Sequence, residues 1–361
     1  MNHFYTLKVA KIQKVTDEAV RITFEIPSSI QDKFKFKQGQ YLNLKFNFGE
    51  EEFRRSYSII DAPSENSQTL SILVKQMENG IISTFLNQNL KENDEVEVQQ
   101  PMGNFCTNYH ASNHKNYVGI AAGSGISPVL SNLKEALFQE PNAKVLLFFG
   151  NKNSQNILLK EELDALKEQF PERFQVTHVL SREPQEDALF EGRITTEKLG
   201  QLLDKNSEIK PEDSTFFICG PTEMIKSTSD FLKKERKVPA LQVLYEYFSA
   251  PDDEDNAEMS EEFKKIPNLE SFVTLIIDDD EYSIHLNSKK ESILDKALKE
   301  NLPVPFACKG GVCCTCKAQV MEGEVFMEKN FALTEDEVAR GFVLTCQCHP
   351  TTNIVMLNYD V

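Results

Sequence analysis

Residues Phe306–Val320 read FACKGGVCCTCKAQV, and this stretch is the most informative part of the chain. It places four cysteines within nine positions: Cys308, Cys313, Cys314 and Cys316. Cys346 follows at a distance. A Cys-x4-Cys-x2-Cys loop with a distant fourth cysteine has the spacing by which a [2Fe–2S] cluster is held. Gly310 and Gly311 let the backbone come close enough for its N–H groups to point at cluster sulfurs.

Zinc is the alternative metal for these cysteines. Cys313-x2-Cys316 and Cys346-x-Cys348 are short spacings of the kind that hold zinc. A zinc site made from these pairs would leave Cys308 unused, which favours the iron–sulfur cluster. Buried structural cysteines are a further alternative, but so dense a group of cysteines is not typical of a protein core.

The block around this stretch, Leu269–Val361, resembles a plant-type ferredoxin. FACKGGVCCTCKA and VLTCQCHP match the cluster loop and the strand that carries the last ligand. SKKESILDKALKENLP predicts a helix between them and the first strands, with Ser288 and Glu291 spaced as a capping box. The resemblance implies an α+β β-grasp fold. It also implies the cluster ligands, Cys308, Cys313, Cys316 and Cys346, and leaves Cys314 and Cys348 outside the ligand set.

The composition bounds the rest of the chain. Its 361 residues predict two or three domains. A net charge of −17 argues against nucleic acid and anionic membranes as partners, because both require clustered lysine and arginine. The acidic surface favours either solubility alone or a basic docking face on a partner. No signal peptide and no apolar run of ~20 residues is found, so we expect a cytoplasmic protein without membrane insertion, in which thiols stay reduced.

The chain divides by pattern into four parts. Residues 1–110 contain short alternating segments such as RITFEI and LSILVK, which predict an antiparallel β-barrel or sandwich. Residues 111–248 alternate short apolar runs with helical patterns, as in a doubly wound α/β domain with a parallel sheet. Residues 249–268 are strongly acidic and are interpreted as a solvated linker. Residues 269–361 form the ferredoxin-like block.

Two elements of the first block have residue types that suit a flat ligand with phosphates. Arg55–Ser58 (RSYS) lies on a predicted strand and combines a guanidinium, an aromatic ring and hydroxyls. Gly80–Thr84 (GIIST) precedes a helical pattern, whose first N–H groups favour a phosphate. Taken singly, each has a plain alternative, a surface strand and an ordinary helix N-cap.

Together these elements resemble the ferredoxin–NADP reductase superfamily, which implies a bound FAD. The resemblance assigns the FAD site to Arg55, Ser56, Tyr57, Ser58, Val74, Lys75, Gly80, Ile82, Ser83 and Thr84. Arg55 and Ser83 would bind the pyrophosphate. Tyr57 would lie against the ring and Ser58 near flavin N5.

The second block has two glycine-containing turns after predicted strands. AAGSGISP brings Gly123, Gly125 and Ser127 to a helix start, which favours a pyrophosphate. It lacks the third glycine of the dinucleotide fingerprint, but it is similar to the superfamily's G-x-G-I-[ST]-P element. CGPTEM resembles the superfamily's C-G-P element and adds three candidate residues, Cys219, Gly220 and Met224. The resemblance puts Cys219 near the nicotinamide; a small buried strand cysteine is the alternative.

Ser181 and Arg182 follow another predicted strand of this block. A carboxylate there favours the ribose hydroxyls of NADH, whereas serine and arginine suit the 2′-phosphate of NADPH. Arg193 is a further candidate, and an arginine on a solvated loop is the alternative. The block ends at Tyr245–Phe248, where the superfamily places an aromatic against the flavin and a glutamate two residues before it. Phe248 and Glu246 match these positions, and Ser58, Cys219 and Glu246 form the predicted catalytic set.

These parts predict an NAD(P)H-dependent reductase that passes electrons from NADPH through FAD and a [2Fe–2S] cluster to a separate oxygenase. FAD accepts two electrons as a hydride and releases them singly to the cluster. The order of domains resembles the reductases of phenylacetyl-CoA epoxidase complexes, whose oxygenase is a di-iron protein. The reductase of a Rieske-type dioxygenase, hydroxylase or desaturase is the alternative. A redox- or iron-sensing module is the hypothesis from a different functional class.

Overall fold

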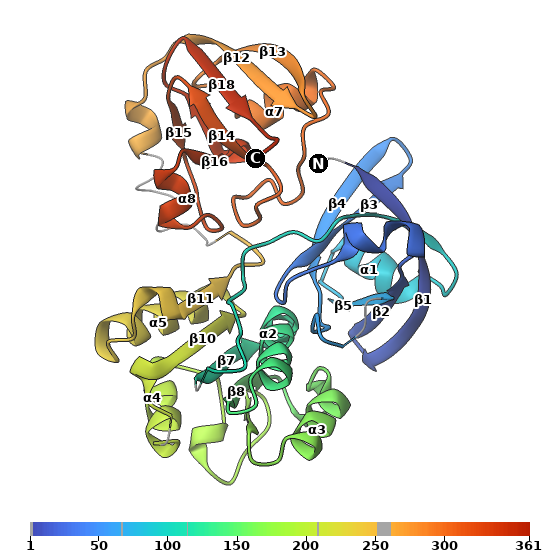
Figure 1. Cartoon of the computed structure of the whole chain (residues 1–361), viewed down its shortest axis with the longest axis vertical. Coiled ribbons are helices and arrows are strands. Elements are labelled where there is room, and N and C mark those ends of the chain that lie inside the picture. The colour runs from blue at the N-terminus through green and yellow to red at the C-terminus, as the bar shows by residue number, and fades with distance from the viewer. Residues whose placement is uncertain (1–2, 66–67, 114, 208, 251–260) are drawn as a thin grey trace. The chain divides into compact units, whose positions relative to one another are not determined.

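The computed structural model describes residues 3–65, 68–113, 115–207, 209–250 and 261–361 (Figure 1). The chain forms two compact units. The larger comprises Tyr5–Phe53 and Tyr57–Phe248, and the smaller is built mainly from Ser249–Val361. The larger unit contains a β-barrel and an α/β domain, and the smaller unit is the ferredoxin-like domain.

The barrel is a six-stranded sheet in the order β4-β3-β6-β1-β2-β5. Its elements are β1 (Phe4–Thr16), β2 (Ala19–Glu25), β3 (Tyr41–Phe48), β4 (Glu51–Ser58), β5 (Thr69–Lys75), α1 (Ile81–Gln88) and β6 (Glu95–Gln99). On β2 the residues Val20, Ile22 and Phe24 are buried in the barrel core, whereas the residues between them are not. This period of two is the one that the sequence showed. A bridge between Ile59 and Ile72, just past the end of β4, closes the sheet.

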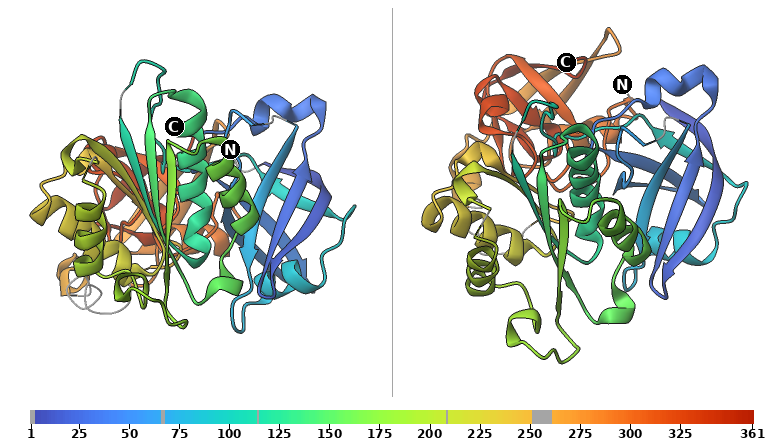
Figure 2. Two further views of the ribbon diagram at one scale, coloured as in Figure 1. Left: turned by 90° about the horizontal axis from the view of Figure 1, so that it is seen from below. Right: turned by 60° about the horizontal axis from the view of Figure 1, so that its bottom comes forward.

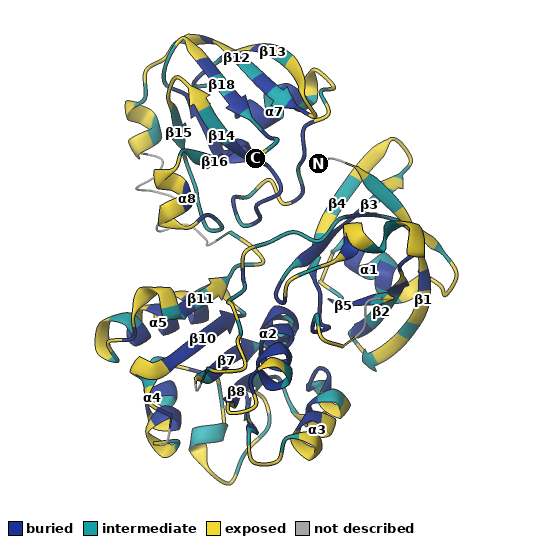
Figure 3. Cartoon of the chain, in the orientation of Figure 1, coloured by how far each residue is buried: buried dark blue, intermediate teal, exposed yellow. Residues whose placement is uncertain are grey.

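The α/β domain has a parallel sheet in the order β11-β10-β7-β8-β9. Its strands are β7 (Asn116–Ala122), β8 (Lys144–Asn151), β9 (Phe174–Leu180), β10 (Ser214–Cys219) and β11 (Val243–Glu246). Its helices are α2 (Ile126–Gln139), α3 (Lys160–Gln169), α4 (Thr196–Lys205) and α5 (Thr222–Asp230). Figure 2 shows α2 and α3 on one face of the sheet and α4 and α5 on the other. Two separate apolar clusters bury the two faces, so the central strands β7, β8 and β10 are mostly dark blue in Figure 3. The doubly wound fold is therefore confirmed.

The ferredoxin-like domain has a five-stranded mixed sheet in the order β13-β12-β18-β14-β16. The sheet strands are β12 (Glu270–Ile277), β13 (Asp280–Asn287), β14 (Lys317–Glu322), β16 (Phe342–Leu344) and β18 (Ile354–Asn358). The other elements are α7 (Ile293–Lys299), α8 (Glu335–Ala339) and the pair β15 (Val325–Met327) and β17 (Cys348–Pro350). Ile293, Leu294 and Ala297 of α7 are buried in the core of this domain. This is the predicted α+β arrangement.

The structure corrects the predicted start of the helix in this domain. Ser288 and Glu291 do not form a capping box, because α7 begins at Ile293 and its N-cap is Ser292, which accepts a hydrogen bond from Asp295 N (3.1 Å). Ser288 instead ties down the incoming chain: its hydroxyl donates to Pro267 O (2.6 Å). The spacing of a capping box was present, but the Ser288 hydroxyl makes a tertiary hydrogen bond to Pro267 O and does not cap the helix.

The acidic segment also differs in part from its prediction as a linker. Residues 251–260 lie outside the described residues. Residues 261–265 form a helical turn, and Phe263 packs edge-on against His349 with ring centroids 4.7 Å apart. Lys289 donates to Phe263 O. The last residues of this segment therefore belong to the ferredoxin-like domain.

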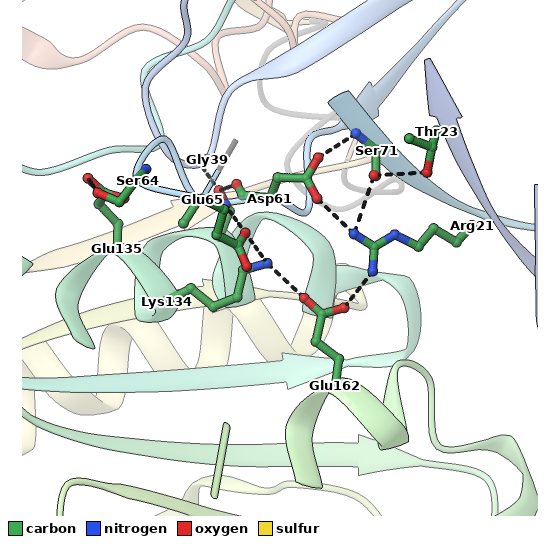
Figure 4. A network of polar contacts seen from close by, with 12 residues as sticks. Arg21, Thr23, Gly39, Asp61, Ser64, Glu65, Ser71, Lys134, Glu135 and Glu162 are labelled. Carbon is green, nitrogen blue, oxygen red and sulfur yellow. Dashed lines mark hydrogen bonds and ion pairs between the residues drawn. The ribbon is translucent and has the colours of Figure 1, made fainter. Parts of the chain in front are cut away.

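A buried charged network joins the barrel to the α/β domain (Figure 4). Lys134 of α2 has a 1% exposed side chain and lies 2.6 Å from Glu65 and 2.7 Å from Glu162 of α3. Burial alone would lower the pKa of Lys134, but the Glu162 and Glu65 carboxylates outweigh burial and raise it. Arg21 of β2 continues the network to Glu162 (3.0 Å) and to Asp61 (2.8 Å). A charge held this way fixes the position of α2 against the barrel.

We expect Lys134→Met to lower the free energy of unfolding by about 3–5 kcal/mol, because it removes the buried cation that pairs with both Glu65 and Glu162. Urea denaturation at pH 7 measures this loss. Lys14→Met is the matched control, since Lys14 is paired with Asp17 at an accessible place on the surface (68% exposed side chain). A loss no larger in Lys134→Met than in Lys14→Met would contradict the role of the network.

Candidate functional site

The predicted cluster ligands lie in two pairs. The thiols of Cys308 and Cys313 are 3.1 Å apart, and the thiols of Cys316 and Cys346 are hydrogen-bonded to each other. The hydrogen bond from Cys313, together with backbone N–H groups that include Gly310 N (3.3 Å), lowers the pKa of Cys308 to about 6. A thiol with a lowered pKa is readily ionised, and thiolate is the form that binds iron.

The elements around the pairs fix their positions. Thr345 donates from both its backbone N–H (3.1 Å) and its hydroxyl (3.0 Å) to Cys316 O, which joins the loop to the strand that precedes Cys346. The buried Tyr359 hydroxyl donates to Thr345 Oγ1 (2.9 Å). Gly311 adopts φ +73°, and its N–H points at the Cys346 sulfur. Backbone donors therefore reach sulfurs of both pairs, as predicted.

Two thiols per pair fit a binuclear cluster, in which each iron takes two cysteines. Within the described ranges, no group of three or more histidine, cysteine or acidic side chains could hold a single ion. Cys314 donates to Ala332 O (3.6 Å) and Cys348 is fully buried in the domain core, so both lie outside the pairs. The four residues therefore fit a [2Fe–2S] cluster.

Most of the residues predicted for FAD lie either at the end of β4 or at the start of α1. Arg55, Ser56, Tyr57 and Ser58 end β4, with Arg55 exposed and Ser58 buried. Gly80 is the N-cap of α1, and Ile82 and Ser83 are buried in its first turn. Ser83 Oγ accepts from Met77 N (3.0 Å), and Thr84 N donates to Gly80 O (3.0 Å). These bonds fix the start of the helix, and the first N–H groups of a helix suit a pyrophosphate.

Val74 and Lys75, the two predicted flavin residues on β5, differ in burial. Val74 is fully buried in the barrel core, and its carbonyl accepts from Asn87 Nδ2 (3.2 Å). Lys75 is half-buried at the end of the strand.

The nicotinamide elements meet where the strand order reverses, between β7 and β10, which is where open α/β sheets bind ligands. Gly123 has φ +54°, and a Cβ there would meet open space. A Cβ on Gly125 would lie 2.3 Å from Cys219 O, so glycine is required for the loop to pack on β10. Ser127 Oγ, in the first turn of α2, is buried without a partner among the described residues. An open turn beside an unsatisfied hydroxyl fits a nucleotide.

The predicted catalytic residues come together at the same place. Ser58 Oγ donates to Glu246 Oε2 (3.1 Å), across from the barrel to the last strand of the α/β sheet. Cys219 is the register partner of Glu246 on the neighbouring strand and is fully buried. Burial raises the pKa of Glu246 to about 8 and raises that of Cys219 well above its ordinary value. The site thus holds a carboxyl that titrates near neutral pH.

Other predicted residues lie around this centre. Gly220 leaves little room for a side chain, because a Cβ would lie 2.6 Å from Met224 Cε. Phe248 follows β11 and is 48% exposed, as a ring that covers a ligand would be. Ser181 and Arg182 are exposed after β9. Gly192 N donates to Leu180 O (2.8 Å), which brings the backbone next to Arg193 to the same strand end.

Two residues near this strand end were not found from the sequence. Lys152 follows β8 and accepts at its carbonyl from Arg182 N (2.7 Å). Glu18, in the turn between β1 and β2, accepts from Lys152 Nζ (3.0 Å). No local motif marks either residue, because their contact joins positions far apart in the chain.

Three family models match the chain. The model described as oxidoreductase FAD-binding domain matches residues 6–107, oxidoreductase NAD-binding domain matches 120–230, and 2Fe-2S iron-sulfur cluster binding domain matches 275–351. The chain is 37% identical over 365 residues to a 1,2-phenylacetyl-CoA epoxidase subunit from Escherichia coli K12, covering 100% of this chain and 99% of that protein. The chain belongs to the FAD- and [2Fe–2S]-containing reductases of the ferredoxin–NADP reductase type.

Further proteins are similar to nearly the whole of this chain. The ferredoxin reductase component of 3-ketosteroid-9-alpha-monooxygenase from Rhodococcus rhodochrous is 27% identical, covering 98% of this chain and 96% of that protein. Phthalate dioxygenase reductase shares the fold with a TM-score of 0.58 and 21% identity, covering 98% of each chain. An intact type IV self-sufficient cytochrome P450 monooxygenase gives a TM-score of 0.72 at 19% identity, covering 98% of this chain and 41% of that one.

The findings identify this reductase as an FAD- and iron–sulfur-containing oxidoreductase that uses a pyridine nucleotide. None of the helices in the described part of the chain has the length and apolar composition that crossing a membrane requires.

Proposed function

We propose that this reductase oxidises NADPH and supplies single electrons, through FAD and the cluster, to a separate di-iron oxygenase of the phenylacetyl-CoA epoxidase type. The observation that carries this proposal is the 37% identity to the phenylacetyl-CoA epoxidase protein of Escherichia coli over the full length of both chains. The identity spans all three domains, so the likeness includes the domain that meets the acceptor.

The arrangement of residues suits the conversion of a hydride into single electrons. FAD, when bound, accepts a hydride and releases electrons one at a time. One proton is left over for each hydride that is split in this way. Ser58 donates to Glu246, so this pair provides a path for that proton away from the ring site. A carboxyl with a pKa of about 8 is well matched to transfer a proton near neutral pH.

A second candidate is the reductase of another oxygenase, such as a Rieske-type dioxygenase, hydroxylase or desaturase. The relative named as a 3-ketosteroid-9-alpha-monooxygenase component supports an oxygenase partner of a different substrate class. Its 27% identity is below the 37% of the epoxidase protein, and we therefore place the epoxidase first.

Reconstitution with purified oxygenase components tests the proposed partner. The reductase, NADPH and phenylacetyl-CoA are combined with the di-iron component of a phenylacetyl-CoA epoxidase, and epoxide formation is measured. A Rieske-type oxygenase with its own substrate is the comparison. Product in the first mixture and not in the second supports the proposal, and the reverse result contradicts it. Steady NADPH oxidation with ferricyanide excludes the sensing module, which would be reduced once without turnover.

The nucleotide preference gives a separate prediction. Arg182→Glu is expected to lower the ratio of kcat/KM for NADPH to that for NADH by about 10- to 100-fold, the size of a lost charge-assisted bond to phosphate. Ferricyanide is the acceptor, so that the cluster does not limit the rate. Arg340→Glu makes the same charge change on the ferredoxin-like domain (58% exposed side chain) and is the control. An unchanged ratio in Arg182→Glu would show that Arg182 does not bind the 2′-phosphate.

A further inference from the structure

Three cationic side chains lie close together at the carboxyl ends of β5, β8 and β9. Lys152 follows β8, Arg182 follows β9, and Lys75 ends β5 of the barrel. Arg182 N donates to Lys152 O (2.7 Å), which places the two strand ends side by side. The positive charges of Lys152 and Arg182 also oppose protonation of Lys75, in addition to the effect of burial on its pKa. Such a group is unusual in a chain with a net charge of −17 and marks a place for an anion.

A carboxylate from the barrel occupies the middle of this group. Glu18 lies in the turn between β1 and β2, and its carbonyl accepts from Gln76 N (2.7 Å), which holds the turn against the end of β5. Its carboxylate accepts from Lys152 Nζ at 3.0 Å and 3.4 Å and lies 3.9 Å from Lys75 Nζ. The hydrogen bond from Lys152 lowers the pKa of Glu18, so the carboxylate is ionised at neutral pH.

The neighbouring Asn151 has an unsatisfied buried amide. It ends β8, directly before Lys152, and is 8% exposed. Its Nδ2 is buried without a hydrogen-bond partner within the part of the chain that the structure describes. A buried amide donor without a partner costs free energy.

The two nucleotides differ at the group that would meet these residues. The 2′-phosphate of NADPH is doubly negative and gains from Lys152 and Arg182, but it is repelled by the Glu18 carboxylate and competes with it for Lys152. The 2′-hydroxyl of NADH donates a hydrogen bond to a carboxylate, which is the role that an acidic residue has in NAD-specific folds. Ser181 and Arg182 stand directly after β9, and Glu183, which follows them, accepts from Ser154 N (2.7 Å). The barrel turn supplies a further carboxylate, Glu18, from elsewhere in the chain.

We propose that Glu18 is a specificity-determining residue of this reductase: it reduces the preference for the 2′-phosphate of NADPH and accepts the 2′-hydroxyl of NADH. This inference rests on the proposed placement of the adenosine ribose at the ends of β8 and β9. Glu18 belongs to the barrel, so the nucleotide preference is set by both domains of the larger unit.

The test compares two adenosine ligands that differ at the 2′ position. Binding of 2′,5′-ADP and of 5′-AMP to the full-length, FAD-loaded protein is measured by isothermal titration calorimetry. Glu18→Gln keeps the shape of the side chain and removes its charge. We expect 2′,5′-ADP to bind the Glu18→Gln variant about fivefold more tightly than the wild type. A fivefold change corresponds to the upper limit of the interaction energy of a partly exposed charge pair. Binding of 5′-AMP should stay the same or weaken. The ratio of kcat/KM for NADPH to that for NADH should rise by a similar factor.

Asp17→Asn is the matched control, because Asp17 is the neighbouring carboxylate and pairs with Lys14 instead (94% exposed side chain). An equal change for both ligands in Glu18→Gln, or the same change in Asp17→Asn as in Glu18→Gln, would overturn the inference.

Failure of this inference is distinguishable from failure of the proposed NADPH site. If Arg182→Glu weakens 2′,5′-ADP and Glu18→Gln has no effect, the phosphate lies where we place it and Glu18 does not discriminate. If Arg182→Glu and Glu18→Gln both leave 2′,5′-ADP binding unchanged, the phosphate lies elsewhere and both proposals are wrong.

Discussion

Cys308→Ser is expected to abolish the reduction of cytochrome c by this reductase while NADPH-dependent reduction of ferricyanide continues. Cys308 is the exposed member of the first thiol pair, and its sulfur accepts hydrogen bonds from backbone N–H groups of the cluster loop. Loss of a direct ligand should lower the cytochrome c rate by more than about 100-fold, because changes to outer-shell partners alone cost 10- to 100-fold. Ferricyanide takes electrons from the flavin and does not need the cluster. Stopped-flow or steady-state assays with the two acceptors measure both rates.

Two cysteine variants serve as controls for this result. Cys106→Ser changes a half-buried thiol of the larger unit, and Cys314→Ser changes a buried thiol within the cluster loop that lies outside the two pairs. Both should keep cytochrome c reduction near the wild-type rate. Equal loss of both activities in Cys308→Ser would contradict the order in which electrons pass from the flavin to the cluster.

Glu246→Gln is expected to lower kcat for ferricyanide reduction by about 100-fold with little change in KM, the size of effect that a proton-transfer residue has. Glutamine keeps an acceptor for Ser58 but cannot take up the proton that the splitting of a hydride leaves behind. Ser58→Ala should give a similar loss, because it removes the donor to Glu246. Glu223→Gln, at an exposed position in the first turn of α5, is the control and should leave kcat unchanged.

The raised pKa of Glu246 predicts how kcat changes with pH. Burial raises its pKa from 4.5 to about 8, so the carboxyl is protonated at pH 6 and ionised at pH 9. Only the ionised form accepts a proton from Ser58. The wild-type kcat should therefore rise as the pH passes through about 8, and Glu246→Gln should lack this inflection. A wild-type profile without an inflection in this range would rule out proton transfer by Glu246.

The sequence was most informative where function is carried by local spacing. The loop from Cys308 to Cys316 and the turn from Gly123 to Ser127 could be predicted because their residues lie within one segment and leave few alternatives. The family resemblance placed Ser58 near flavin N5 and assigned Glu246 to the catalytic set. The hydrogen bond between them was not predicted, since nothing local connects a barrel strand with the last strand of the α/β sheet.

The residues that sequence analysis missed act over long distances in the chain. Lys134 is buried between Glu65 and Glu162, and no pattern around it distinguishes it from a surface lysine of a helix. Glu18 lies in a turn that is ordinary by sequence and gains its role from Lys152 of another domain.

At Ser288 the sequence predicted a local contact that the structure does not have. The spacing to Glu291 matched a capping box, but the Ser288 hydroxyl donates to Pro267 O instead.

Anaerobic titration with NADPH, followed by low-temperature EPR, tests the central assignment most directly. The purified protein is reduced stepwise, and the flavin absorbance and the EPR spectrum are recorded together. The account predicts that the flavin bleaches and that the rhombic signal of a reduced binuclear iron–sulfur cluster develops in the same titration. Full bleaching of the flavin without that signal, in protein shown to contain two irons per chain, would contradict transfer from the flavin to the cysteine-bound cluster.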